Sequence, residues 1–78
     1  MEVLAFGIAR DIIGKSNFTL SDPTIKTVED FRNYFYQKYP DLLKLNSLAI
    51  AVNEQYAHND FLLNDFDEIA LIPPVSGG

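Results

Sequence analysis

The sequence predicts an α+β domain in which one main helix covers one face of a mixed sheet of four or five strands. Short runs rich in β-branched and aromatic residues occur near both ends of the chain. Between them lies a single apolar stripe at helical spacing. The 78 residues, 47% of them hydrophobic and 13% aromatic, suit one small domain with a packed core and argue against disorder.

The first quarter of the chain predicts a β-hairpin. Residues 2–8, EVLAFGI, are expected to form the first strand because they combine β-branched and aromatic side chains. Gly14 indicates a turn, with one short helical turn over residues 9–13 before it. Residues 18–21, FTLS, then provide a short second strand that pairs with the first.

The main helix is expected to begin after Thr27, whose hydroxyl can accept a backbone N–H of the first turn. Glu29 and Asp30 place negative charge at the positive end of the helix dipole. Pro40 ends the helix at the preceding residue. The stripe that should face the sheet consists of Val28, Phe31, Phe35 and Tyr39.

The second half of the chain predicts two further strands. Residues 48–53, LAIAVN, are apolar nearly throughout and are expected in the centre of the sheet. Short pieces and turns follow until residues 68–75, EIALIPPV, which form the last strand. A hairpin, a crossover helix and a last strand that returns beside the first make up the β-grasp arrangement found in ubiquitin.

Composition and charge exclude several classes of function. Without cysteine there is no disulfide, thiolate zinc site or cysteine nucleophile, and His58 alone cannot build a histidine metal site. The sequence shows no acid–base pair, metal-ligand cluster or phosphate-binding loop, so it does not predict an independent enzyme. No membrane span or secretory signal is predicted, so a cytoplasmic location is expected. The net charge of −5 argues against nucleic acid, and favours either a basic partner or solubility alone.

The chain ends in PPVSGG, which predicts a compact domain over residues 1–74 and an extended tail over 75–78. Proline fixes φ and cannot donate to a sheet, so the last strand should lose its pairing near these residues. Six extended residues span up to roughly 20 Å, and glycine enters channels that a side chain would block. This stretch consists of Pro73, Pro74, Val75, Ser76, Gly77 and Gly78.

This ending, NDFDEIALIPPVSGG, resembles the C-terminus of the sulfur-carrier subunits of molybdopterin synthase, a ubiquitin-like family. The opening VLAFGIARDIIG and the AVN of residues 51–53 are similar to the same family, so the resemblance runs over the full length. One position departs from the pattern, because Phe66 stands where the family usually has glycine. Glycine suits a positive φ there, so either the turn type differs or Phe66 is strained.

The resemblance implies a cycle of sulfur transfer in molybdenum cofactor biosynthesis. An activating enzyme uses ATP to adenylate the carboxylate of Gly78, and a sulfur donor converts it to a thiocarboxylate. The large synthase subunit then receives the tail, and the sulfur attacks cyclic pyranopterin monophosphate. The resemblance implies a heterotetramer of two small and two large subunits, with no cofactor, metal, nucleic acid or membrane bound by the small one.

The family resemblance also implies a partner interface that includes Phe6, Arg10, Tyr56 and Ile72. The alternative for the three apolar residues is ordinary core packing, and for Arg10 it is a solvated charge. Three other functions stay open: a sulfur carrier for thiamine or tRNA thiolation, a ubiquitin-like modifier joined to lysines, and a β-grasp binding module with an incidental Gly-Gly ending.

Overall fold

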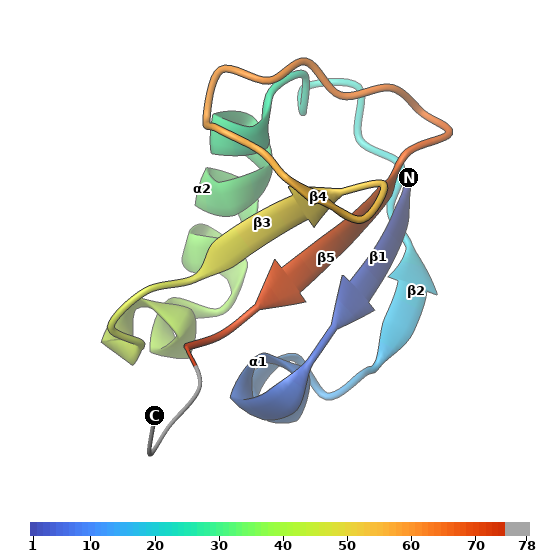
Figure 1. The fold of residues 1–78 in the computed structure, drawn as a ribbon. Helices are drawn as coiled ribbons and strands as arrows, with labels where there is room; N and C mark the ends of the chain where they lie inside the picture. Colours follow the sequence, from blue (N-terminus) through green and yellow to red (C-terminus); the bar gives the residue numbers. More distant parts are fainter. Residues whose placement is uncertain (75–78) are drawn as a thin grey trace.

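The computed structural model describes residues 1–74, which form one five-stranded sheet in the order β2-β1-β5-β3-β4 (Figure 1). The two central strands β1 and β5 run parallel, and the remaining neighbours pair antiparallel. The last strand therefore lies beside the first, as the sequence predicts, and the fold is a β-grasp fold. The strands are β1 (Glu2–Ala5), β2 (Asn17–Thr19), β3 (Ala49–Val52), β4 (Gln55–Tyr56) and β5 (Glu68–Ile72).

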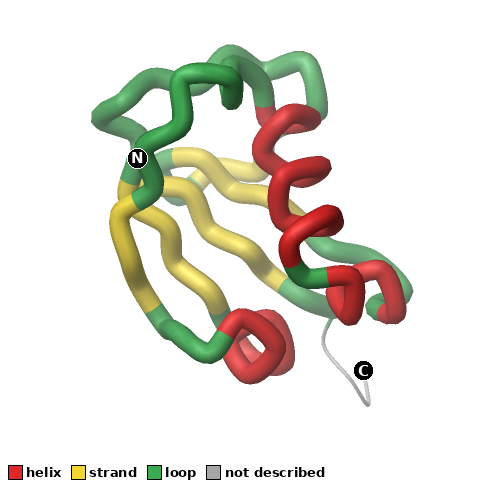
Figure 2. The backbone as a smooth tube through the Cα atoms, turned by 180° about the vertical axis from the view of Figure 1, so that it is seen from behind, coloured by secondary structure: helices red, strands yellow, loops and turns green. Residues whose placement is uncertain are grey.

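The main helix α2 (Val28–Lys38) lies across the back of this sheet, as Figure 2 shows. It begins with a complete capping box: the Thr27 hydroxyl accepts the Asp30 N–H at 3.1 Å, and the Asp30 carboxylate accepts the Thr27 N–H at 3.1 Å. The predicted N-cap is thus confirmed. The 3₁₀ helix η1 (Pro40–Lys44) follows and connects α2 to β3.

The hydrophobic core lies between α2 and the sheet. The predicted stripe of α2 is buried at Val28, Phe31 and Phe35, while Tyr39 is half-buried and stacks on Phe35 with ring centroids 6.1 Å apart. From the sheet side, alternate residues of the strands point into the same core, because successive side chains of a strand face opposite ways. These core residues of the strands are Val3, Ala5, Ile50, Val52, Ile69 and Leu71.

The first strand is shorter than predicted, because the chain leaves the sheet after Ala5 and enters helix α1 (Gly7–Ile13). Gly7 has a φ of +52°, which turns the backbone out of the strand direction. Ala9 and Ile13 then lie four residues apart on one buried helix face. Gly14 ends the helix in the left-handed region, at a φ of +87°. The predicted helical turn over residues 9–13 is confirmed, and the helix begins two residues earlier, inside the run that was predicted to be strand.

Strand β5 ends at Ile72, directly before Pro73, which confirms the predicted loss of pairing at the prolines. The predicted last strand over residues 68–75 is correspondingly too long. A proline has no N–H to offer the neighbouring strand, so the ladder stops one residue ahead of it. Because β5 ends at Ile72, the chain leaves the sheet at Pro73.

Candidate functional site

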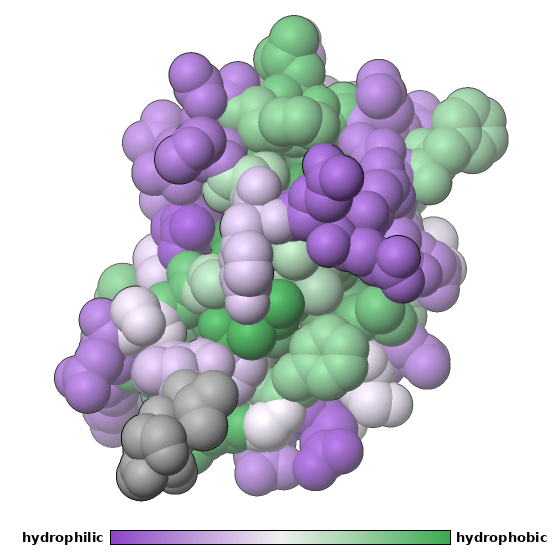
Figure 3. Space-filling model, viewed as in Figure 1, coloured by the Kyte–Doolittle hydropathy of each residue, from purple (hydrophilic) through white to green (hydrophobic). Residues whose placement is uncertain are grey.

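The face of the sheet opposite α2 is not covered by any described helix and carries a hollow of about 280 Å³ (Figure 3). We call this depression the sheet hollow. It crosses the centre of the sheet, because it takes residues from β1, β5, β3 and the β3–β4 turn. Its lining residues are Leu4, Phe6, Ala51, Glu54, Tyr56, Glu68, Ala70 and Ile72.

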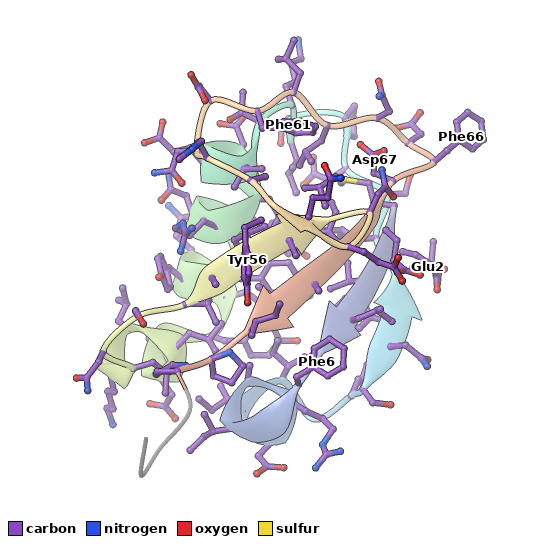
Figure 4. The ribbon with its side chains drawn as sticks, in the orientation of Figure 1. Glu2, Phe6, Tyr56, Phe61, Phe66 and Asp67 are labelled. Atoms are coloured by element: carbon purple, nitrogen blue, oxygen red, sulfur yellow. The ribbon has the colours of Figure 1, made fainter. Side chains whose placement is uncertain are left out.

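Three of the four predicted interface residues meet at the sheet hollow. Phe6 is 49% exposed and Tyr56 is 75% exposed, so core packing does not explain these two aromatic side chains. Both lie on the open face, Phe6 where β1 gives way to α1 and Tyr56 on β4 (Figure 4). Ile72 is half-buried between them at the end of β5. This exposed apolar surface is the candidate docking site of the described residues.

Arg10 lies apart from the sheet hollow, on helix α1. Its Nε atom is 3.9 Å from the Asp11 carboxylate, and both side chains are more than half exposed. An exposed ion pair at this distance holds the guanidinium weakly. The role of Arg10 at an interface therefore stays a prediction.

Two carboxylates form one side of the sheet hollow, and neither was among the interface residues predicted from the sequence. Glu54 and Glu68 both line the hollow, and Glu68 lies opposite Glu2 in the register of the two parallel strands. The Thr19 hydroxyl donates to the Glu2 carboxylate at 2.7 Å. The register could not be read from the sequence, because β1 and β5 are separated by most of the chain.

A hydrogen-bonded clip holds the start of β5 beside the β3–β4 turn. The Asn53 amide donates to the Asp67 carboxylate at 2.9 Å, and the Asn64 N–H donates to its other oxygen at 2.7 Å. The Glu68 N–H in turn donates to the Asn53 side chain at 3.0 Å. Asn53 has a φ of 51° and its neighbour Glu54 a φ of 72°, as a tight hairpin turn requires. The clip places Glu54 and Glu68 on the same side of the sheet hollow.

Phe66 occupies the corner of the turn that precedes β5 and points away from the molecule (Figure 4). Its side chain is 99% exposed. Among the described residues, the non-glycine positions with positive φ are Asn53 and Glu54, so Phe66 has an ordinary backbone. The turn therefore differs in type from one that needs glycine, and Phe66 is not strained.

Pro73 packs against α1 where the chain leaves the sheet. A Cβ atom placed on Gly7 would lie 3.2 Å from Pro73 Cγ, so the absence of a side chain at Gly7 allows this close approach. Pro73 is half-buried and Pro74 is exposed. The other tail residues predicted to act in transfer lie outside the described residues: Val75, Ser76, Gly77 and Gly78.

The ionisable groups with shifted pKa values lie away from the sheet hollow. Hydrogen bonds from Thr24 lower the pKa of Asp22, and hydrogen bonds from the Lys26 and Thr27 N–H groups lower that of Asp30. The Tyr34 hydroxyl beside Lys38 raises the pKa of that ammonium group. Residues 1–74 hold no cluster of three His, Cys, Asp or Glu side chains suited to a metal, and none of their helices is long and apolar enough to span a membrane.

Comparison with known proteins identifies close relatives over the whole chain. The model of the ThiS family matches residues 3–78. The molybdopterin synthase sulfur carrier subunit of Caenorhabditis briggsae is 40% identical over 81 residues, which cover 100% of this chain and 96% of that one.

Two solved structures add to this likeness. One is the complex of subunits 1 and 2 of the molybdopterin-converting factor from Helicobacter pylori, whose matching chain is 31% identical with a TM-score of 0.67, covering 99% of this chain and 96% of that one. The other is the small archaeal modifier protein 1 from Methanosarcina acetivorans, 28% identical with a TM-score of 0.79, covering 99% of this chain and 94% of that one.

Proposed function

The chain belongs to the ThiS family, and from this premise we propose that it is the sulfur carrier subunit of a molybdopterin synthase. The observation that carries this function is the full-length likeness to named sulfur carrier subunits, which reaches 40% identity. The likeness includes the region of the Pro-Pro-Val-Ser-Gly-Gly ending, since the family match extends to residue 78. The resemblance expected from the sequence is thereby confirmed.

The geometry supports a carrier whose folded domain docks while its tail reacts. Strand β5 runs through the centre of the sheet, and its last residue, Ile72, lines the sheet hollow. A partner seated on the open face therefore lies next to the point where Pro73 begins the tail. Because the prolines restrict the backbone, less entropy is lost when the tail enters the partner.

The chemistry proposed for the tail is acyl activation followed by sulfur transfer. The Gly78 carboxylate attacks the α-phosphate of ATP on an activating enzyme, which releases pyrophosphate and leaves an acyl-adenylate. A sulfur donor at the oxidation level of sulfide displaces AMP and leaves the thiocarboxylate. In the large subunit this sulfur attacks a side-chain carbon of the cyclic pyranopterin monophosphate and replaces an oxygen substituent, whose carbon–oxygen bond breaks. Water then cleaves the acyl–sulfur bond and restores the carboxylate. A dithiolene contains two sulfur atoms, so two thiocarboxylated carriers are used for each product.

The partners of this cycle are the large synthase subunit, the activating enzyme and the sulfur donor. The related Helicobacter pylori protein was solved as a complex of subunits 1 and 2, which supports docking to a large subunit. We assign the open face with Phe6, Tyr56 and Ile72 to this contact, and Arg10 to its margin. Because one tail must enter two enzymes in turn, the large subunit and the activating enzyme bind to the carrier one after the other. The assembled synthase contains two small and two large subunits.

A one-residue extension of the C-terminus tests the proposed function. The chain with alanine added after Gly78 should fold normally, give no thiocarboxylate with the activating enzyme, ATP and a sulfur donor, and form no dithiolene with the large subunit. Mass spectrometry detects exchange of one oxygen for sulfur on the unextended chain. The matched control carries the same alanine before Met1, at the other end of the sequence from the reacting carboxylate. It should be converted to the thiocarboxylate normally. Dithiolene formation by the C-terminally extended chain would contradict the proposal.

A second candidate, a modifier joined to lysines of other proteins, is favoured by the likeness to the small archaeal modifier protein 1. Both functions begin with adenylation of the same carboxylate, so activation alone does not separate them. Lysine-linked conjugates of Gly78 in cell lysate would support the modifier, whereas free thiocarboxylated chain would support the carrier. Co-purification with a thiamine or tRNA thiolation enzyme, in place of a large synthase subunit, would indicate those pathways.

A further inference from the structure

The sheet hollow has apolar walls on one side and carboxylates on the other. Leu4, Ala70 and Ile72 provide aliphatic surface, and the Tyr56 ring borders it. Glu54 and Glu68 lie on the remaining side. Figure 3 shows this division on the open face, where hydrophobic surface in the centre meets hydrophilic surface beside it. An apolar partner residue alone would leave the two carboxylates desolvated and unpaired on docking, which is costly.

The chain itself supplies no cation to these carboxylates within residues 1–74. The ion pairs of this part of the chain are Arg10 with Asp11 and Lys44 with Asp41, on other elements. Glu68 instead lies directly opposite a third carboxylate, Glu2, on the neighbouring strand. The arrangement leaves negative charge on the open face available to another molecule.

We propose that the sheet hollow binds a basic side chain, an arginine, of the large synthase subunit. This inference rests on the proposed function, because it needs that subunit to dock on the open face. The methylene groups of the arginine lie along Leu4 and Ala70, and its guanidinium group reaches Glu54 and Glu68. The Tyr56 ring lies beside the cation.

Arginine fits this hollow better than lysine or an aliphatic residue does. Its guanidinium is planar, donates several hydrogen bonds at once and stacks on aromatic rings. It is also more weakly hydrated than an ammonium group, so its transfer into a half-apolar hollow costs less. Charge-assisted hydrogen bonds to two carboxylates then specify both the partner and its register on the sheet.

The double variant Glu54→Gln and Glu68→Gln tests this inference because it removes both charges and keeps the side-chain shape. Its Kd for the isolated large subunit, measured by calorimetry, should rise at least about tenfold, with a weaker salt dependence than wild type. The matched control, Asp41→Asn with Asp60→Asn, changes the net charge equally on exposed residues outside the hollow and should stay within about twofold of wild type. The Tm of the double variant should stay close to that of wild type, since both glutamates are exposed.

Footprinting of the large subunit with phenylglyoxal, which modifies guanidinium groups, tests whether the bound side chain of that subunit is an arginine. One arginine of that subunit should be protected in the complex with wild type and modified in the presence of the double variant. Wild-type affinity of the double variant, an equal loss in the control, or protection of lysines alone would overturn the inference. If wild type itself fails to bind the large subunit, the proposed function falls along with it.

Discussion

At the scale of single residues, polar side chains near the start of β5 determine the geometry of the docking face. Asp67 is 9% exposed, and both of its carboxylate oxygens accept hydrogen bonds, from Asn53 and Asn64. Its carbonyl oxygen also accepts the Glu2 N–H at 3.0 Å, which joins the start of β1 to the same point. Hydrogen bonds to a charged group contribute more to stability than hydrogen bonds between neutral groups, so this clip should contribute strongly to stability.

Replacement of Asp67 by alanine should therefore destabilise the domain by about 1–3 kcal/mol, because the Asn53 amide and the Asn64 N–H lose their acceptor. For a domain of this size, such a loss lowers Tm by roughly 4–8 °C per kcal/mol. Thermal unfolding followed by circular dichroism measures the change. Asp65→Ala is the matched control, because Asp65 is exposed in the same turn. Equal losses in the two variants would show that the clip is unimportant.

At the scale of elements, helix α2 shows how local signals and packing act together. Its capping box satisfies backbone donors at the first turn, while Phe31 and Phe35 bury its inner face. Asp30 takes part in the capping box and also accepts the Lys26 N–H at 3.0 Å. These bonds favour the charged carboxylate, which is why the pKa of Asp30 lies below its ordinary value of 3.8.

The capping box predicts a pH-dependent contribution to stability. A carboxyl group whose pKa is lowered by folding stabilises the folded state above its ordinary pKa, and this contribution is lost as pH falls through the lower, folded value. Asp30→Asn should thus lower Tm at neutral pH, and its difference from wild type should shrink on acidification below about pH 3.8. Thr27→Ala, which removes the other half of the box, should cost about 1 kcal/mol.

Asp60→Asn is the control for this series, because Asp60 is exposed and lies outside the helix. Its Tm should follow that of wild type at each pH. A constant difference between Asp30→Asn and wild type across the acid range would contradict the assignment of the lowered pKa to the capping box.

At the scale of the whole molecule, one small core must support a sheet that is covered on only one face. Phe35 lies at the centre of this core, with the rings of Phe31, Tyr34 and Phe18 at centroid distances of 4.8, 5.1 and 6.1 Å. A domain of this size has a stability of only about 3–5 kcal/mol from its core. A single large cavity can therefore remove most of it.

Replacement of Phe35 by alanine should cost about 3–5 kcal/mol and leave the domain largely unfolded at room temperature. Phe35→Leu, which leaves a smaller cavity, should remain folded with a lower urea midpoint. Urea denaturation followed by circular dichroism checks both expectations. Phe66→Ala, at a ring that is 99% exposed, should change the midpoint little. A comparable loss at Phe66 would mean that this exposed ring contributes to stability.

Several features of this protein could be predicted from local sequence. Thr27 and the apolar stripe identified α2, the prolines set the end of β5, and the Gly-Gly ending with its Pro-Pro-Val-Ser stretch identified the family. The helical turn at residues 9–13 was predicted, but the residue at which the first strand gives way to α1 was not, because short apolar runs suit both structures. For Phe66 the sequence left open either a different turn type or a strained backbone, because residue type alone does not give the backbone dihedrals.

The sequence by itself determined helix α2, the strands β1, β2, β3 and β5, their order along the chain, and the chemistry expected of the last residues. Capping, periodicity and proline act over a few neighbouring positions, so these features can be read locally. Only the tertiary structure decided that Glu2 lies opposite Glu68, that Asn53 binds Asp67, and that Phe6, Tyr56 and Ile72 surround one hollow. These contacts join residues far apart in the chain. They depend on strand register, and a shift of one residue would turn each side chain to the other face of the sheet.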